Sequence, residues 1–375
     1  MSGVAVLGST GSIGQSTLEV LRRQRDRFRI VALTAGSNAE LLAAQVAEFQ
    51  PVFAGLADGP AGGRAGGDFD WGPDCLIHAA TRPDVDIVVN AVVGFAGLDA
   101  TLAALRAGKR VALANKESLV TAGALVMEAA RTGGGQLIPV DSEHSAVLQC
   151  IAAGRSDPVR LVLTASGGPF RTWDGPRMAR ASVDEALNHP TWRMGHKITV
   201  DSATLVNKAL EVIEGHFLFG LPYDALEVVV HPQSVVHAFV EFADRSVLAQ
   251  VGFPSMELPI LYALTFPERL PDQGVRRFDP VAAGALTFEP LRTDAFRAFA
   301  LGVAMGRRGG SAPAAFNAAN EVAVAAFLEG RIQFGRIAEV IEAVCAAHDP
   351  VPVSSVEIVR DVDAWSRARA REFLG

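Results

Sequence analysis

Three acidic side chains in two distant segments are the residues of this sequence best suited to chemistry. Asp141 and Glu143 lie in PVDSEHSA, and Glu211 lies in SATLVNKALE. Carboxylate oxygens are hard ligands, so three of them around one point favour Mg²⁺ or Mn²⁺ over zinc or copper. Asp141 and Glu143 follow the apolar strand QLIPV, and an extended backbone places residues two apart on one face. A plain helix start is the alternative interpretation of this acid-Ser-acid tripeptide.

The segment around Glu211 is predicted to be a helix with a polar face. Asn207 lies four residues before Glu211 and Lys208 lies three residues before it, so the three side chains are neighbours on a helix surface. A solvated face of ion pairs is the alternative, although the apolar residues of this segment already account for a buried side. The face carries an amide, an ammonium and a carboxylate.

A cofactor signature stands at the amino end of the chain. GSTGSIG places Gly8, Gly11 and Gly14 between an apolar strand and an amphipathic helix, where the turn brings a pyrophosphate close to the helix N-terminus. A structural glycine turn is the alternative. The second strand ends in TAGSN, so Ser37 and Asn38 stand where NAD enzymes usually carry an acid. The missing carboxylate favours NADP over NAD.

Further polar residues follow predicted strands or occupy loops. Asn115, Lys116 and Glu117 follow the strand RVALA at its carboxyl end, where open α/β sheets place ligands, although a solvated charge pair at a helix start is the alternative. Ser166 in TASGGPF can bind a phosphate together with nearby backbone N–H groups. Trp192 lies in NHPTWRMGHK, a segment that can close over a ligand as a lid; a fixed core aromatic is the alternative.

The elements that position these residues indicate an α/β protein with three parts. Strands alternate with helices up to about residue 141, which predicts a Rossmann-like doubly wound sheet. From about residue 159 a mixed pattern with an antiparallel hairpin at 243–245 predicts a central α+β catalytic domain, and the Ala-rich tail predicts a C-terminal helical bundle. Residues 55–74 are expected to be a surface loop or a degraded strand-helix unit. The predicted domains are 1–141, 142–265 with a lid near 186–196, a linker at 266–291, and 292–375.

Composition narrows the classes of function. The net charge of -7 argues against a nucleic-acid partner, although a local group of donors can still bind a phosphorylated small molecule. The three cysteines are far apart and fit neither a metal site nor a disulfide framework, as in a reducing compartment. We expect neither a signal peptide nor a membrane span, and therefore a cytoplasmic protein with no membrane partner.

Taken together and in order, six motifs resemble the 1-deoxy-D-xylulose 5-phosphate reductoisomerase family: GSTGSIG, ANKESLV, PVDSEHSA, TASGGPF, HPTWRMG and VDSATLVNKALE. The resemblance covers essentially the whole chain. It implies conversion of 1-deoxy-D-xylulose 5-phosphate to 2-C-methyl-D-erythritol 4-phosphate in isoprenoid biosynthesis, with NADPH and a divalent cation (Mg²⁺, Mn²⁺ or Co²⁺). It also implies a homodimer whose subunits carry a mobile lid.

The resemblance assigns roles residue by residue. Metal ligation falls to Asp141, Glu143 and Glu211. The NADPH contacts fall to Thr10, Gly11, Ser12, Ile13, Gly36, Ser37, Asn38, Asn115, Glu117 and Gly195. The substrate contacts fall to Lys116, Ser142, Glu143, Ser166, His189, Ser202, Asn207, Lys208 and Glu211, of which Lys116, Glu143 and His189 are catalytic. Trp192 and Met194 belong to the lid. Many family members have a basic residue where this chain has Ser37.

Two other functions compete with this interpretation. A semialdehyde or homoserine dehydrogenase also binds NADP, but the former needs a catalytic cysteine, and Cys150 has no matching context. A non-catalytic NADP sensor has no use for three carboxylates around a cation.

Overall fold

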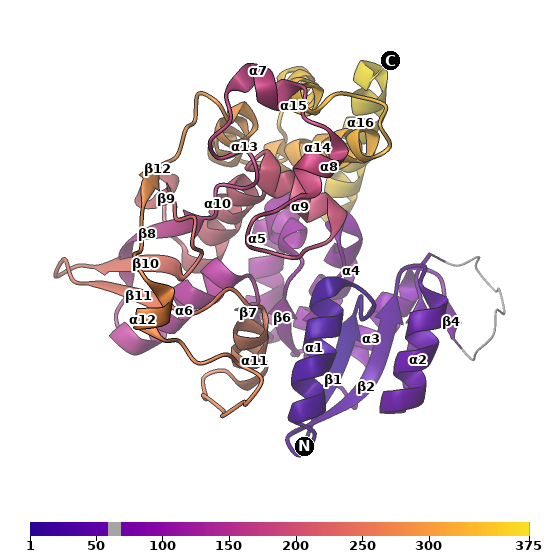
Figure 1. Ribbon diagram of the computed structural model, residues 1–375. Coiled ribbons are helices and arrows are strands. Elements are labelled where there is room, and N and C mark those ends of the chain that lie inside the picture. Colours follow the sequence, from indigo (N-terminus) through magenta and orange to yellow (C-terminus); the bar gives the residue numbers. More distant parts are fainter. Residues whose placement is uncertain (59–68, 375) are drawn as a thin grey trace. The chain divides into compact units, whose positions relative to one another are not determined.

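The computed structural model describes residues 1–58 and 69–374 (Figure 1). They form two compact units. The first comprises Met1–Ser118, Val126–Ser145 and Ser255–Arg276, and the second comprises Leu119–Leu125, Ala146–Pro254 and the chain from Arg277 onward. The predicted domain boundaries remain a prediction.

The first unit contains a seven-stranded, wholly parallel sheet of order β4-β3-β2-β1-β5-β6-β7. The chain builds outward from β1 to β4 and then returns to β5 on the other side of β1. Open sheets bind ligands where the strand order reverses in this way. The strands are β1 (Ser2–Leu7), β2 (Phe28–Ala35), β3 (Phe53–Leu56), β4 (Asp70–Trp71), β5 (Ile87–Asn90), β6 (Arg110–Leu113) and β7 (Gln136–Pro139).

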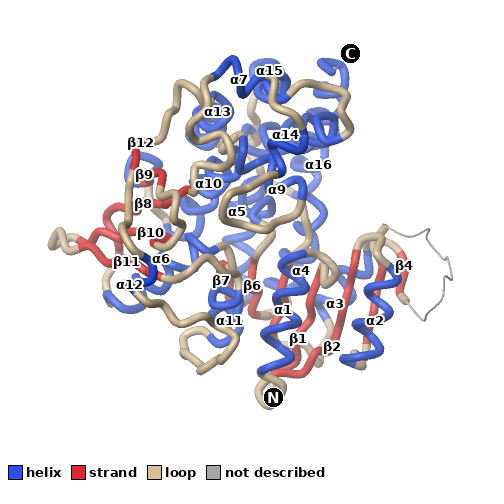
Figure 2. Tube along the Cα trace, viewed as in Figure 1, coloured by secondary structure: helices blue, strands red, loops and turns tan. Residues whose placement is uncertain are grey.

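Helices connect β1 to β2, β2 to β3, β4 to β5, β5 to β6 and β6 to β7, as the alternating pattern predicted (Figure 2). In the first helix Leu18, Val20 and Leu21 are buried and Arg22 and Arg23 occupy the last turn, so its apolar face packs inward. The helices of this unit are α1 (Ser12–Arg23), α2 (Ala39–Phe49), α3 (Asp74–Thr81), α4 (Leu98–Arg106), α11 (Glu257–Thr265), both ends of α5 (Lys116–Gly133) and the beginning of α6 (Ser142–Gly154).

In the stretch 55–74 the described residues agree with the second of the two expected alternatives, a degraded strand-helix unit. Its residues 59–68 lie outside the described residues. On either side the chain forms the end of β3 and the two-residue strand β4, which pairs with β3 at the sheet edge. The sequence pattern for a strand is weak here because β3 has only four residues.

The second unit contains a five-stranded mixed sheet of order β11-β10-β8-β9-β12. The predicted hairpin is confirmed: β10 and β11 pair antiparallel around a turn in which Arg245 has φ +70°. The α+β prediction for the central part is therefore correct. The strands are β8 (Pro158–Ala165), β9 (Leu226–Val230), β10 (Val236–Phe242), β11 (Val247–Val251) and β12 (Glu289–Pro290).

Helices make up the rest of the second unit, and the predicted C-terminal helical part is confirmed. Most of them share an apolar core with β8 and β10 that includes Phe170, Phe316 and Phe327. The helices are α7 (Gly175–Ala179), α8 (Val183–Leu187), α9 (His196–Ala203), α10 (Val206–Phe219), α12 (Pro280–Ala283), α13 (Arg297–Arg308), α14 (Ala312–Leu328), α15 (Phe334–Ala347) and α16 (Val356–Leu374).

The three cysteines, Cys75, Cys150 and Cys345, are free and buried, as expected. Within residues 1–58 and 69–374, none of the helices combines the length and the apolar character that crossing a bilayer requires.

Candidate functional site

The glycine turn after β1 has a backbone that only glycine fits. Gly8 has φ +76°, and a Cβ on it would lie 2.7 Å from the carbonyl oxygen of Ala91. A Cβ on Gly14 would lie 2.2 Å from the Gly8 carbonyl oxygen. Helix α1 begins directly afterwards. Its N-cap, Gly11, offers no side-chain hydrogen bond, and its first turn contains no acidic residue. Free N–H groups and the helix dipole therefore favour an anion here, and the residues fit a pyrophosphate.

The end of β2 shows both what the sequence predicted and what it missed. Ser37 and Asn38 are exposed, and Asn38 accepts a hydrogen bond from the Leu41 N–H at 3.1 Å as the N-cap of α2. However, Asp58 comes in from the end of the neighbouring strand β3. Its Oδ2 lies 2.7 Å from where a Cβ on Gly36 would stand. A carboxylate is therefore present at this turn after all.

Asp58→Asn is expected to raise the preference for NADPH over NADH about three- to tenfold. Two like charges about 4 Å apart in water repel each other by roughly 1 kcal/mol. The neutral amide removes the repulsion of a 2′-phosphate. The ratio of kcat/KM values with the two coenzymes measures the effect. Asp26→Asn, which removes an exposed charge just before β2, is the control. An unchanged or reduced ratio in Asp58→Asn would contradict this role.

Asn115 is a buried organiser of the loop after β5. Its Nδ2 donates to the carbonyl oxygens of Val92 and Gly94, both at 2.8 Å, and to Glu117 at 3.2 Å. Its Oδ1 accepts from the Ser118 N–H as the N-cap of α5. Asn115 is fully buried and Glu117 is 6% exposed. The alternative of a solvated charge pair at this helix start is therefore wrong.

Lys116 is buried beside an acid from the next strand. Its Nζ lies 2.6 Å from Asp141 Oδ2, and the two side chains are 8% and 14% exposed. Both residues follow the carboxyl ends of adjacent parallel strands, β6 and β7. An ion pair this deep holds both side chains in fixed positions.

The geometry expected for Asp141 and Glu143 is wrong, although both residues remain candidates. The two do not share the face of an extended strand, because β7 ends at Pro139 and α6 begins at Ser142. Glu143 is in the first helical turn, where the dipole favours a carboxylate. Ser142 Oγ donates to Glu143 Oε2 at 2.7 Å. The helix start that stood as the alternative is thus the means by which the acids are presented.

Helix α10 carries the other predicted group, and the expected face is confirmed. Asn207 Nδ2 donates to Glu211 Oε1 at 2.5 Å, and Lys208 Nζ pairs with Glu211 Oε2. Lys208 is 5% and Glu211 is 1% exposed, so the solvated alternative is excluded. A left-handed residue, Leu205 with φ +58°, separates α9 from α10. Ser202, 9% exposed, lies on α9 before this break.

Ser166 and His189 meet in the second unit. Ser166 Oγ lies 3.0 Å from His189 Nε2. The other ring nitrogen, Nδ1, accepts hydrogen bonds from the N–H groups of Thr191 at 3.1 Å and Trp192 at 2.9 Å. Nδ1 therefore carries no proton, and Nε2–H donates to Ser166. Burial lowers the pKa of His189 to about 4.

His189 is expected to be the neutral Nε2–H tautomer at pH 7. Since its pKa lies below the ordinary 6.5, the unfolded chain takes up this proton first as the pH falls. The stability contributed by neutral His189 is complete above about pH 6.5 and is lost towards pH 4. Imidazole ¹⁵N shifts across this range measure tautomer and titration together. A midpoint near 6.5, or a protonated Nδ1, would contradict the assignment.

The remaining residues of the predicted lid lie between α8 and α9. Trp192 is half-buried and its ring centroid lies 6.4 Å from that of His237, so it is not part of the apolar core. Met194 is half-buried and Gly195, the N-cap of α9, is exposed. The alternative of a fixed core aromatic is therefore wrong for Trp192.

Three family models match successive parts of the chain. A model described as 1-deoxy-D-xylulose 5-phosphate reductoisomerase matches residues 4–123. The model of that enzyme's C-terminal domain matches residues 137–219, and a second model, described as the DXP reductoisomerase C-terminal domain, matches residues 251–369.

Full-length proteins agree with these models. A 1-deoxy-D-xylulose 5-phosphate reductoisomerase of Geobacillus kaustophilus is 49% identical over 383 residues, covering 100% of both chains. The solved reductoisomerase of Zymomonas mobilis, in complex with NADPH, is 42% identical with a TM-score of 0.89, covering 100% of this chain and 99% of the other. A solved DOX-P reductoisomerase with NADPH, fosmidomycin and magnesium is 40% identical with a TM-score of 0.92, covering 100% and 98%.

Proposed function

The chain belongs to the 1-deoxy-D-xylulose 5-phosphate reductoisomerase family, and we propose how its own residues carry out the reaction of that family. It is an NADPH-dependent oxidoreductase that converts 1-deoxy-D-xylulose 5-phosphate to 2-C-methyl-D-erythritol 4-phosphate with a divalent metal, in isoprenoid biosynthesis. Similarity over the full length leaves no place for the dehydrogenase or sensor alternatives, and Cys150 is buried.

The first unit is proposed to hold the cofactor, which supplies hydride when bound. The turn of Thr10, Gly11, Ser12 and Ile13 offers N–H groups to the pyrophosphate. The glycines of the turn support this contact, because a Cβ on Gly8 or Gly14 would clash with nearby backbone atoms. Gly36, Ser37 and Asn38 adjoin the adenosine ribose. Asn115 acts by fixing the loop at Val92 and Gly94, since its own polar atoms are engaged there. Glu117 and, in the other unit, Gly195 complete the contacts.

Asp141, Glu143 and Glu211 are proposed to share one divalent cation. The donor set fits: three carboxylates and no soft ligand suit Mg²⁺ or Mn²⁺. Such an ion, when bound, polarises the carbonyl and hydroxyl oxygens of the substrate. The buried group on α10 carries this proposal. Glu211 is 1% exposed and is held by an amide and an ammonium. Burying these charges costs desolvation free energy, and buried ionisable groups of this kind gather at functional sites.

The second unit is proposed to bind the substrate phosphate. Ser166, Ser202, Asn207 and Lys208 supply hydroxyl, amide and ammonium donors, which are the groups that phosphate oxygens accept from. His189 in the assigned tautomer adds an Nε2–H donor beside Ser166. A neutral imidazole donates a hydrogen bond without losing its proton, so His189 positions the substrate rather than acting as an acid at pH 7.

Lys116 is proposed to stabilise developing negative charge on the oxygens of the substrate's carbon skeleton, together with Ser142. Its ammonium is fixed by Asp141 and lies away from bulk water, where a preorganised charge is most effective. Trp192 and Met194 are proposed to cover the bound substrate and exclude water.

We also propose a homodimer that acts in the cytoplasm. Strand β11 lies at the edge of the second unit's sheet and exposes Val247 by 51% and Leu248 by 37%. An edge strand with exposed apolar side chains favours pairing with another copy. Three free thiols fit a reducing compartment.

Oxidation of NADPH in the presence of 1-deoxy-D-xylulose 5-phosphate tests the function. We expect absorbance at 340 nm to fall only with both substrate and divalent cation, to stop on addition of EDTA, and to return with excess Mn²⁺ or Mg²⁺. Turnover that is unaffected by EDTA would remove the metal from the reaction, and absence of turnover with the metal present would contradict the proposed substrate.

A further inference from the structure

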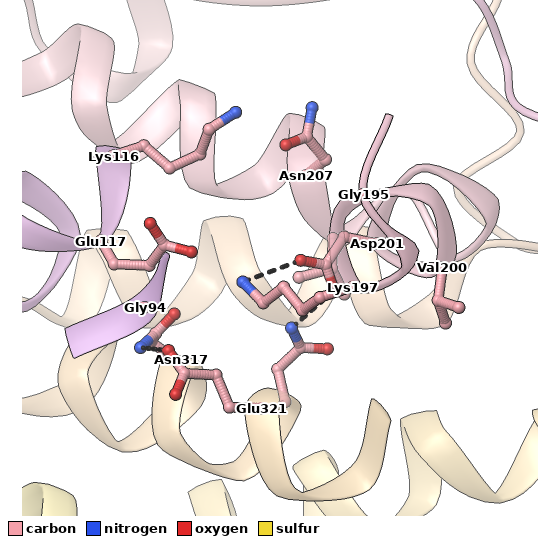
Figure 3. Close-up of polar contacts among 12 residues, drawn as sticks. Gly94, Lys116, Glu117, Gly195, Lys197, Val200, Asp201, Asn207, Asn317 and Glu321 are labelled. Atoms are coloured by element: carbon pink, nitrogen blue, oxygen red, sulfur yellow. Dashed lines mark hydrogen bonds and ion pairs between the residues drawn. The ribbon is translucent and has the colours of Figure 1, made fainter. Parts of the chain in front are cut away.

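A buried polar cluster joins α9 to α14 within the second unit. Asp201 on α9 is 1% exposed; its Oδ1 accepts from Asn320 Nδ2 at 2.8 Å, and its Oδ2 pairs with Lys197 at 2.9 Å. Figure 3 shows Lys197 and Asp201 joined in this way. Asn320 is fully buried and lies 119 residues further along the chain. It therefore links α14 to α9 through a side-chain hydrogen bond.

Helix α9 needs such an anchor. It has only eight residues, its N-cap Gly195 offers no side-chain hydrogen bond, and it ends before the left-handed Leu205. Helices this short are not stable by themselves, so tertiary contacts must hold it in place. A buried carboxylate is a strong anchor because leaving one of its oxygens without a donor costs the desolvation of a charge.

A hydrogen bond and ion pairs also hold helix α14 in place close to Asn320. Asn317, also fully buried, donates to Glu321 on its own helix at 2.9 Å, and Glu321 pairs with Arg367 of α16 at 2.5 Å. Arg367 also pairs with Asp363 at 2.6 Å. The C-terminal helices thus present Asn320 from a rigid support.

We propose that Asn320 is a positioning residue for the substrate: by holding Asp201 it fixes α9, and with it the adjacent Ser202 and the end of the lid at Gly195. This inference rests on the proposed phosphate-binding role of Ser202. It gives the C-terminal helices a part in substrate binding, although Asn320 itself reaches neither substrate nor cofactor.

Asn320→Leu and Asn317→Leu form a matched pair that tests the proposal. Both remove a fully buried amide from α14, but only Asn320 bonds to α9. We expect Asn320→Leu to raise the KM for the sugar phosphate about tenfold with kcat within about twofold, as for binding lost in ground and transition states alike. Asn317→Leu leaves the pair of Glu321 with Arg367 in place, so it should leave KM within about twofold. Asn320→Ser, which is too short to reach Asp201, should behave like Asn320→Leu.

Coupling to Ser202 separates positioning from general loss of stability. Combined with Ser202→Ala, Asn320→Leu should raise KM by less than the product of the single effects, since both act through one contact. Equal KM changes in the two leucine variants, strictly multiplicative effects, or failure of both Asn320 variants to fold would overturn the proposal. Amide hydrogen exchange of α9, faster in Asn320→Leu than in Asn317→Leu, checks the anchor without turnover, so an inactive wild-type chain would count against the proposed function and not against the anchor.

Discussion

Glu211→Gln is expected to lower kcat at least about a thousandfold, because a Lewis-acid metal is worth several kcal/mol and each 1.36 kcal/mol is a factor of ten. Glutamine keeps the shape of the side chain and can still accept from Asn207. It loses the charge that attracts a cation and that balances the buried Lys208. NADPH binding, which is proposed for the first unit, should change little.

Steady-state kinetics over a range of Mn²⁺ concentrations measure this effect. A part of the lost activity should return at high Mn²⁺, because the other two carboxylates remain. Glu227→Gln serves as the control. Glu227 lies on β9 of the same unit, and its Oε1 lies 2.7 Å from Nε of Arg160 on β8. Wild-type kcat in Glu211→Gln at low Mn²⁺ would contradict the assignment of this residue to the metal.

Lys116→Met is expected to have the second largest effect, lowering kcat about a hundred- to a thousandfold, the range seen when one preorganised donor to a developing charge is removed. The methionine fills similar space but carries no charge. Asp141 then loses its ammonium partner, so affinity for a divalent cation should be maintained or increased. The two variants therefore differ: Glu211→Gln loses metal and turnover, whereas Lys116→Met loses turnover alone.

Kinetics and Mn²⁺ titration of Lys116→Met provide the check. Lys109→Met is a suitable control, because Lys109 precedes the same strand and its Nζ donates to the backbone carbonyl of Arg82 at 2.9 Å. A Lys116→Met variant that binds Mn²⁺ more weakly than wild type, or that turns over normally, would place this lysine outside the proposed role.

Local patterns predicted those parts of the molecule that depend on local spacing. The helical spacing of Asn207, Lys208 and Glu211 placed them on one face of α10, and the glycine turn stands between strand and helix as expected. The alternation of strands and helices also predicted the parallel sheet, since a strand and the helix that follows it are neighbours in the sequence.

Contacts between residues far apart in the sequence could not be predicted from local patterns. Asp58 reaches the turn at Gly36 because β3 pairs with β2, and the pattern at the end of β2 contains no trace of it. The tautomer of His189 depends on how the following backbone turns back on the ring. The extended geometry assumed for Asp141 and Glu143 failed because three acceptor-rich residues after a strand also start a helix, and α6 begins at Ser142.

Mn²⁺ binding, followed by electron paramagnetic resonance in wild type, Asp141→Asn and Glu211→Gln, tests most directly whether acids from both units serve one ion. We expect a single site in wild type, with an affinity for Mn²⁺ that either substitution lowers more than about tenfold, because loss of a mere outer partner of a ligand already costs that much. Retention of the wild-type site in Glu211→Gln, with its loss only in Asp141→Asn, would contradict it.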